Sequence, residues 1–353
     1  MAAECETTDA TSNSSVGIVL VLLACCCYAL GNCLQRYSLL RQDDEKVLYC
    51  LNRHAGWLLG AIIYFSANGI YAVALSFAPV SVLAAVFSLT IVANATCANL
   101  LLGDRVLRTA LPGYIAVLAG SVVFSLTVQA EVCHFGGEEL IQVMTSPLAF
   151  FYWACMAVIV LGGMVYAWKF EKAFSLVVKA TEDAPTSFAV FDNENSEEVN
   201  EAKEPSSIEL LTAGFIYPAS LGATEAVGAL ILKAVNSLFT TLATDEDDPE
   251  EPANNHLSLW IGLLGVGVFI FAGIVTWLRL VYSRFEITAA FPVEFGMLTF
   301  ASVVGGFMVF EDHQYVASAW AWVWVICASL LILGGIAIVG LASWKDKVNS
   351  VVP

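Results

Sequence analysis

Residues 16–35 read VGIVLVLLACCCYALGNCLQ, and no charged side chain interrupts this stretch. An α-helix rises about 1.5 Å per residue, so roughly twenty residues cross a hydrocarbon core about 30 Å thick. The stretch lacks the period-two alternation of a membrane β-strand, which favours a helix over a barrel. It therefore predicts a transmembrane α-helix.

The whole chain has the composition of a membrane protein. Of its 353 residues, 58% are hydrophobic and only 13% are charged, and the mean hydropathy is +0.75. A soluble fold could not bury that much apolar surface. Further apolar runs of similar length predict an all-α polytopic membrane protein with about nine transmembrane helices. The predicted spans are residues 16–35, 55–76, 80–102, 110–128, 147–168, 211–235, 257–278, 287–310 and 317–342.

The positions of lysine and arginine test this count independently of hydropathy. At least one of the two occurs in each of the first, third, fifth and seventh loops and in the tail, whereas the N-terminal segment and the other loops contain neither. Only Lys233 falls within a predicted span. Basic residues collect on the cytoplasmic side of a membrane. The alternation therefore predicts that residues 1–15 are extracellular and that residues 344–353 form a cytoplasmic tail.

The loops predicted to lie outside are acidic as well as free of basic residues. Glu131, Glu138 and Glu139 lie in the fourth loop, and residues 245–251 add further carboxylates in the sixth. Such a surface raises the local concentration of cations and repels anions, within a Debye length of about 8 Å. A merely solvated acidic loop explains the same residues equally well. No nucleic-acid partner is predicted.

The longest polar segment, residues 169–210, is predicted to be an acidic and mostly disordered cytoplasmic linker. It separates a first transmembrane half, residues 16–168, from a second half, residues 211–343. A membrane receptor or scaffold that signals through this linker is an alternative to a transporter. That alternative predicts a cytosolic partner for residues 181–209.

The two halves carry signs of an inverted repeat. Residues 29–36, ALGNCLQR, can be laid on residues 226–233, AVGALILK. A second register places Phe87 on Phe295, and LAG at 118–120 resembles LGG at 333–335. These matches pair spans one, three and four with spans six, eight and nine, so the halves have opposite orientations. Inverted repeats are typical of transporters with a binding site near the midplane.

Two carboxylates lie inside predicted spans, where charges are costly and usually mark a functional site. Glu225 lies near the middle of the sixth span, and Glu294 lies in the eighth, two positions after Pro292, which frees a backbone carbonyl. Mg²⁺ is commonly held by one or two carboxylates and several waters, so we predict a Mg²⁺ site at Glu225 and Glu294. The pair would also suit proton coupling. Alternatively, both residues merely pack helices in a protonated or paired form, with Lys233 as a distant partner of Glu225.

Neutral polar residues recur at helical spacing on the first three spans. The three sets are Tyr28, Asn32 and Gln35; Tyr64, Asn68 and Tyr71; and Thr90 and Asn94. We expect these stripes to face inward, and Asn32, Asn68, Asn94 and Thr90 are the candidates for contact with a substrate or ion. Interhelical hydrogen bonding explains the stripes as readily.

Metal, disulfide and catalytic motifs are weak or missing in the sequence. Most of the ten cysteines lie within predicted spans without paired ligand spacing, although Cys5 and Cys133 fall on the same outer side and leave a disulfide open. There is no HExxH pair, no GxSxG elbow and no phosphate-binding glycine loop. The sequence therefore predicts neither an enzyme nor a bound cofactor.

Residues 76–82, SFAPVSV, followed by Leu89-Thr90, resemble the stretch that opens the third helix of drug/metabolite transporter (EamA-like) superfamily proteins. Within that superfamily the chain resembles the NIPA-like magnesium transporters. Their first helix ends in a glycine and a basic run similar to residues 31–36, and their sixth carries a pair like Lys233-Ala234. Their eighth has a proline step where this chain has AFP at 290–292. The resemblance makes Gly31, Pro79, Lys233 and Pro292 structural or gating candidates.

The resemblance implies transport of Mg²⁺ by alternating access, at the plasma membrane or in endosomes. The runner-up is another drug/metabolite transporter that carries a small organic solute, for which Tyr64, Tyr71 and Phe87 would form the pocket. No cofactor is predicted, and Mg²⁺ would be a transported substrate. The sequence leaves open whether the chain forms a homo-oligomer in the lipid bilayer.

Overall fold

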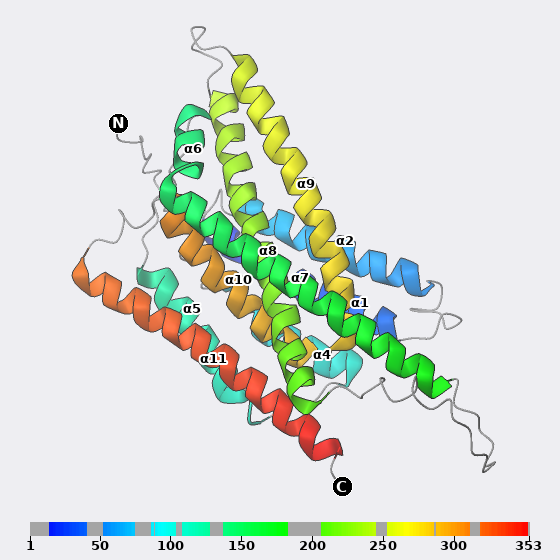
Figure 1. Ribbon diagram of the computed structural model, residues 1–353. Coiled ribbons are helices and arrows are strands. Elements are labelled where there is room, and N and C mark those ends of the chain that lie inside the picture. Colours follow the sequence, from blue (N-terminus) through cyan, green and yellow to red (C-terminus); the bar gives the residue numbers. More distant parts are fainter. Residues whose placement is uncertain are drawn as a thin grey trace, which may run out of the picture.

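The computed structural model describes residues 14–40, 52–74, 86–87, 89–103, 108–127, 137–182, 206–244, 253–285, 287–310 and 318–351. In this part of the chain all regular structure is helical, which confirms the predicted all-α class (Figure 1). The helices are α1 (Ser14–Leu40), α2 (Arg53–Ala74), α4 (Thr90–Leu102), α5 (Leu111–Thr127), α6 (Gly137–Met144), α7 (Pro147–Glu182), α8 (Ser207–Thr244), α9 (Ala253–Arg284), α10 (Ile287–Val309) and α11 (Ala319–Val351).

Seven of these helices are long and apolar enough to cross a membrane, namely α1, α2, α7, α8, α9, α10 and α11. The chain is therefore a multi-pass membrane protein. The two remaining predicted spans coincide with shorter apolar helices, residues Thr90–Leu102 of α4 and Leu111–Phe124 of α5. Residues 80–85 of the third predicted span lie outside the described residues, and the total of nine spans remains a prediction.

Several helix ends differ from the hydropathy limits because hydropathy follows apolar character rather than helix propensity. Helix α7 continues to Glu182, so the first part of the predicted linker is helical rather than disordered. Residues 169–182 contain no proline and no glycine, and nothing in them ends a helix. Similarly, α11 continues through the predicted tail to Val351. The rest of the linker, residues 183–205, lies outside the described residues.

Local capping explains where two of the long helices begin. Before α8, the amide of Glu209 donates to Ser206 Oγ at 3.3 Å and the amide of Ser206 donates to Glu209 Oε2 at 2.8 Å, which is a reciprocal capping box. Before α7, Ala149 N donates to Ser146 Oγ at 3.2 Å, and Pro147 occupies the first helical position. These polar caps lie outside the apolar runs.

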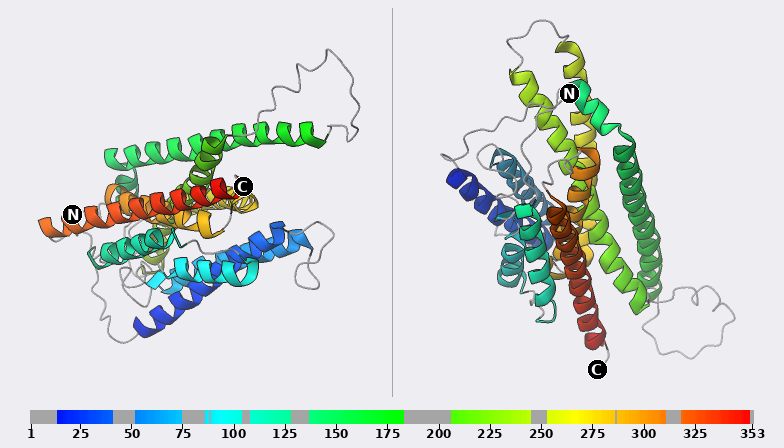
Figure 2. Two further views of the ribbon diagram at one scale, coloured as in Figure 1. Left: turned by 90° about the horizontal axis from the view of Figure 1, so that it is seen from below. Right: turned by 90° about the vertical axis from the view of Figure 1, so that its left-hand side faces the viewer.

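The helices pack around α8 and α10. Helix α8 contacts α7, α9, α10 and α11, and α10 also contacts α4, α5, α7 and α11. Figure 2 shows α7 along one side of the bundle and α1 with α2 along the opposite side, with α11 between them. In the apolar window of α8, 56% of residues are buried, against 6% in α9. Helix α9 therefore lies at the periphery of the bundle.

Small residues allow the closest helix crossings. A Cβ atom added at Gly31 of α1 would lie 2.7 Å from the backbone nitrogen of Tyr64 in α2, and one added at Gly60 of α2 would lie 2.8 Å from Gln35. A Cβ atom at Gly222 of α8 would lie 2.9 Å from Leu298 N in α10. Close backbone approach at glycine is typical of helix packing in membranes. Gly31, a candidate structural residue, thus lies at the α1–α2 crossing.

Candidate functional site

The two intramembrane carboxylates both lie in the interior of the bundle. Glu225 of α8 is 7% exposed and Glu294 of α10 is fully buried. The crossing at Gly222, one turn before Glu225, brings α8 against the backbone of Glu294. The two carboxyl groups are close enough to interact electrostatically. Helix packing therefore brings together two residues of different helices, α8 and α10, although the whole of α9 lies between them in the sequence.

A chain of hydroxyl groups leads to Glu225 from the first half of the protein. Tyr64 of α2 donates its hydroxyl proton to Glu225 Oε1. Tyr28 Oη of α1 lies 2.7 Å from Tyr64 Oη. Because the single proton of Tyr64 points to the carboxylate, Tyr28 must be the donor in that second bond. Glu225 Oε2 is buried without a hydrogen-bond partner among the described residues.

Glu294 has a tyrosine partner of its own, which sequence reasoning missed. Tyr282 of α9 lies with its hydroxyl 3.0 Å from Glu294 Oε2 and 3.4 Å from Oε1. The seventh span was predicted to end at Leu278, so Tyr282 was assigned to a loop. Continued helical spacing after Leu278 was the only signal for it, because hydropathy falls at Tyr282, Ser283 and Arg284.

Arg36 is a second residue that the sequence placed wrongly. It was assigned to the first cytoplasmic loop, but it lies in α1 and is 7% exposed. Its Nη1 donates to the backbone oxygen of Tyr282 at 3.4 Å. The interior of the bundle therefore contains a basic side chain that the charge pattern had assigned to a loop. A long arginine side chain can reach a carbonyl of a neighbouring helix, which no count of charges along the chain reveals.

Aromatic rings border the carboxylates. The ring centroid of Tyr28 lies 5.8 Å from that of Phe87 and 5.9 Å from that of Phe291. Phe291 lies 5.7 Å from Phe295, and Tyr71 lies 4.6 Å from Phe87. The predicted pocket residues Tyr64, Tyr71 and Phe87 thus belong to one aromatic cluster around Tyr28.

The predicted amide and hydroxyl candidates divide into two groups. Asn32 is fully buried and Asn94 is 1% exposed, and neither amide has a hydrogen-bond partner among the described residues. In contrast, Asn68 is half-buried and donates to Tyr64 O at 3.1 Å, and Thr90 donates to Phe87 O at 2.6 Å. Of these four candidates, Asn32 and Asn94 therefore have amide groups that make no hydrogen bond with the described residues.

The remaining candidates have structural surroundings. Lys233 is exposed, and its Nζ lies 4.2 Å from the centre of the Phe310 ring, so its described contact is with an aromatic ring rather than Glu225. Pro292 lies inside α10, where it removes the hydrogen bond to the carbonyl of residue 288. Pro79 and the cysteines of the open disulfide, Cys5 and Cys133, lie outside the described residues.

The donor set fits a hard cation bound through oxygen. In the described part of the chain no three histidine, cysteine, aspartate or glutamate residues come together. Two carboxylates alone do not fill the six or more oxygen positions of Ca²⁺, but they suffice for Mg²⁺, which keeps several of its waters. Glu225 Oε2 accepts no hydrogen bond from the described residues, so it can meet a cation without losing one.

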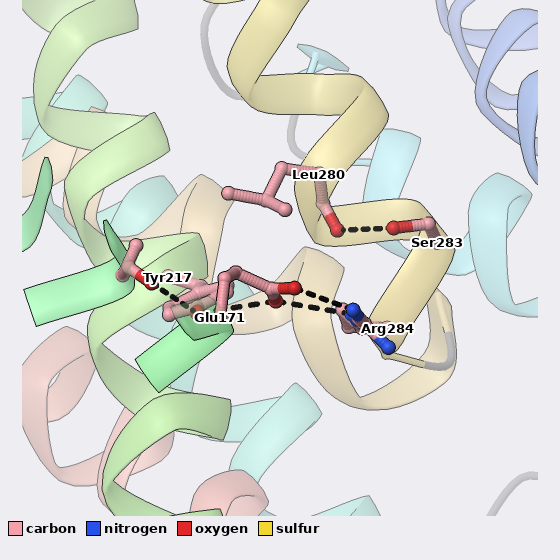
Figure 3. Close-up of polar contacts among 6 residues, drawn as sticks. Glu171, Tyr217, Leu280, Ser283 and Arg284 are labelled. Atoms are coloured by element: carbon pink, nitrogen blue, oxygen red, sulfur yellow. Dashed lines mark hydrogen bonds and ion pairs between the residues drawn. The ribbon is translucent and has the colours of Figure 1, made fainter. Parts of the chain in front are cut away.

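A polar cluster joins α7, α8 and α9 at the end of the bundle predicted to be cytoplasmic (Figure 3). Arg284 Nε donates to Glu171 Oε1 at 3.0 Å, and its terminal nitrogen donates to Oε2. Tyr217 Oη lies 3.4 Å from the same carboxylate. The side chains of Arg284 and Glu171 are 36% and 25% exposed. The pair clamps α9 to α7 across α8.

We expect this clamp to contribute only a modest stabilisation, because the pair is partly exposed to water. A double-mutant cycle of Arg284→Ala and Glu171→Ala should give a coupling free energy of about 0.5–1 kcal/mol that falls as salt is added. Thermal unfolding in detergent measures it. Ser283→Ala is the control, since Ser283 Oγ bonds only Leu280 O of its own helix, at 2.8 Å, among the described contacts (Figure 3). No coupling at low salt would contradict the clamp.

Comparisons of the chain with models of protein families, with curated proteins and with solved structures found no match.

Proposed function

We propose that the protein is a membrane transporter of divalent cations, and that Mg²⁺ is its substrate. The buried pair of Glu225 and Glu294 is the observation that carries this proposal. Among the described residues, each carboxylate has a tyrosine hydroxyl as its hydrogen-bond partner, and neither forms an ion pair with a basic side chain. Buried carboxylates without a fixed positive charge attract a mobile one.

An inverted repeat would supply the outward-open and inward-open states that alternating access requires. Contacts between helices support the presence of such a repeat. Under the register that lays residues 29–36 on 226–233, Cys25 corresponds to Gly222. Under the register of Phe87 and Phe295, Val86 corresponds to Glu294. Cys25 Sγ contacts Val86 O at 3.7 Å, and a Cβ atom at Gly222 would contact Glu294 O. Corresponding residues therefore make corresponding contacts, in the first half between α1 and the residues just before α4 and in the second half between α8 and α10.

The contact between α5 and α11 supports the same two-fold relation. A Cβ atom at Gly120 would lie 3.2 Å from Ile332 N, and one at Gly335 would lie 3.0 Å from Val117 N. The register that lays residues 118–120 on 333–335 converts Gly120 into Gly335 and Ile332 into Val117. The two contacts are thus exchanged by the repeat, as expected if a two-fold axis passes between these helices.

In this architecture, rocking of one half against the other alternates access to the carboxylates. Tyr28 and Tyr64 belong to the first half, whereas Glu225, Tyr282 and Glu294 belong to the second. The bond between Tyr64 and Glu225 crosses the boundary, and it is one of the contacts that rocking would break. The bond between Tyr282 and Glu294 moves with the second half.

The resemblance of residues 31–36, 76–82 and 290–292 to NIPA-like magnesium transporters agrees with this assignment. With it we propose the plasma membrane or endosomes as the location, and an outer N-terminus. The acidic residues Glu138 and Glu139 of α6 would then lie on the side from which the cation arrives.

The aromatic cluster favours a second candidate function, transport of a small organic ammonium ion. The rings of Phe87 and Phe291 lie 5.8 and 5.9 Å from that of Tyr28, whose hydroxyl leads through Tyr64 to Glu225. Ring faces and a carboxylate together attract an alkylated cation. Tyr71 and Phe295 extend the same aromatic surface.

Uptake into proteoliposomes distinguishes these functions. With an inward Mg²⁺ gradient, we expect the purified wild-type protein to produce Mg²⁺ uptake that saturates with concentration and that protein-free liposomes lack. Uptake of tetraethylammonium is measured in parallel. Tetraethylammonium flux without Mg²⁺ flux would replace the magnesium assignment with the organic one. Absence of both fluxes, with gradients in either direction, would favour the receptor or scaffold.

A further inference from the structure

Three buried amide side chains of α1 and α4 have no hydrogen-bond partner among the described residues. Asn32 and Gln35 of α1 are fully buried, and Asn94 of α4 is 1% exposed. In each, both the amide nitrogen and the amide oxygen lack a partner among the described residues. An unpaired buried amide costs about 1–3 kcal/mol, so native proteins contain few of them. Three together in one region indicate that they serve a polar partner.

The three amides lie on one inner surface formed by α1, α2 and α4, and Gln35 lies on the α2 side of this surface, against Gly60. Asn32 and Gln35 follow Tyr28 at intervals of four and seven residues, which is one face of a helix. Cys25 meets Val86 and Phe87, which immediately precede α4, and further along α1 Cys33 lies in the same apolar cluster as Cys97 of α4. Asn32 and Asn94 fall between these two levels.

This surface leads from the carboxylates toward one side of the membrane only. Gln35 lies about 10 Å along α1 beyond Tyr28, on the side that the basic residues predict to be cytoplasmic. Under the two registers of the repeat, the residues of the second half that correspond to Asn32, Gln35 and Asn94 are Ala229, Leu232 and Ser302. The corresponding outer surface therefore has no amide, so the two-fold repeat does not account for the amides.

We propose that Asn32, Gln35 and Asn94 form a second, neutral station on the cytoplasmic side of Glu225 and Glu294, where a divalent cation is held through its own water molecules. This station rests on the proposed transport of Mg²⁺. Amide oxygens accept hydrogen bonds from metal-bound water, and Mg²⁺ gives up its water reluctantly.

A station from which the cation leaves toward the cytoplasm must bind it only weakly. An uncharged site lets the ion leave, whereas the carboxylates hold it more tightly. Arg36 follows Gln35, and its guanidinium donates to the carbonyl oxygen of Tyr282. A fixed positive charge beside the station shortens the stay of the cation and favours its release.

Apolar replacement of the amides tests the station. The variant combines Asn32→Leu, Gln35→Met and Asn94→Leu, and uptake of Mg²⁺ into proteoliposomes is measured together with thermal unfolding. The second probe is hexaamminecobalt(III), an ion of the size of hydrated Mg²⁺ that cannot shed its ligands. We expect it to inhibit the wild type from the cytoplasmic face. In the triple variant we expect Mg²⁺ flux to fall about tenfold and this inhibition to disappear.

Two further variants separate the station from mere packing. Thr96→Val removes an exposed hydroxyl of α4 that bonds Val92 O of the same helix, and it should leave flux and inhibition unchanged. Asn32→Ser keeps an oxygen that accepts a bond from water, and it should retain most of the flux even where the triple variant fails to fold. Unchanged flux, or lowered flux with inhibition intact, overturns the station. Absence of Mg²⁺ flux in the wild type instead refutes the proposed function itself.

Discussion

Glu294→Gln is expected to lower Mg²⁺ uptake at least about a hundredfold, which corresponds to roughly 2.7 kcal/mol, while the protein remains folded. Glu294 is fully buried, and only its charge distinguishes it from glutamine, which has the same size. The amide oxygen of glutamine still accepts the hydrogen bond from Tyr282, so the local packing is preserved. What is lost is the attraction for a divalent cation in an environment that screens charges poorly.

Uptake at matched amounts of reconstituted protein measures this effect. Glu138→Gln is the control, because Glu138 is an exposed carboxylate of α6 and its removal changes the net charge equally. Glu225→Gln should resemble Glu294→Gln, since both carboxylates serve one ion. Near-normal Mg²⁺ uptake in Glu294→Gln would show that this carboxylate only packs helices.

Gly222→Ala is expected to destabilise the protein by about 2–4 kcal/mol, near the upper end for overpacking. The added Cβ atom would lie 2.9 Å from Leu298 N and closer still to the carbonyl oxygen of Glu294. Both are backbone atoms, so no side chain can rotate away and α8 must separate from α10. That separation would also move Glu294 away from Glu225 and thereby reduce Mg²⁺ uptake.

Thermal unfolding in detergent, together with uptake, measures this change. Gly228→Ala is a matched control on the same helix, because its Cβ atom would meet Ile270 and Ile274 at 3.5 Å, which is ordinary contact. Alanine favours helix over glycine by about 1 kcal/mol, so Gly228→Ala should be neutral or stabilising. Equal melting temperatures for the two variants would contradict the close crossing at Gly222.

Prediction from sequence succeeded best where a single segment contains all the information. A run such as residues 16–35 is apolar on every face, so it requires a helix in lipid whatever its neighbours are. Glu225 and Glu294 were identifiable for the same reason, because a carboxylate in such a run stands out from its surroundings. Asn32, Gln35, Tyr64 and Asn94 followed from helical spacing, and all four are buried.

The predictions that failed concerned polar residues near helix ends. Residues 169–182 have too many charges to be recognised by hydropathy, yet they continue α7. Arg36 and Tyr282 also lie beyond the apolar runs, and they meet each other only because α1 packs on α9. At the membrane boundary, apolar character and helical structure no longer coincide.

By itself the sequence determined the helical class, seven long apolar helices and the two carboxylates within them, because each is set by the residues of one segment in a solvent of low polarity. Only the tertiary structure decided which groups meet. It placed Tyr64 against Glu225 and Tyr282 against Glu294, and it left the amides of Asn32 and Asn94 without partners among the described residues. Such pairings depend on how closely helices approach at Gly31 and Gly222, which is a property of two surfaces and not of either segment alone.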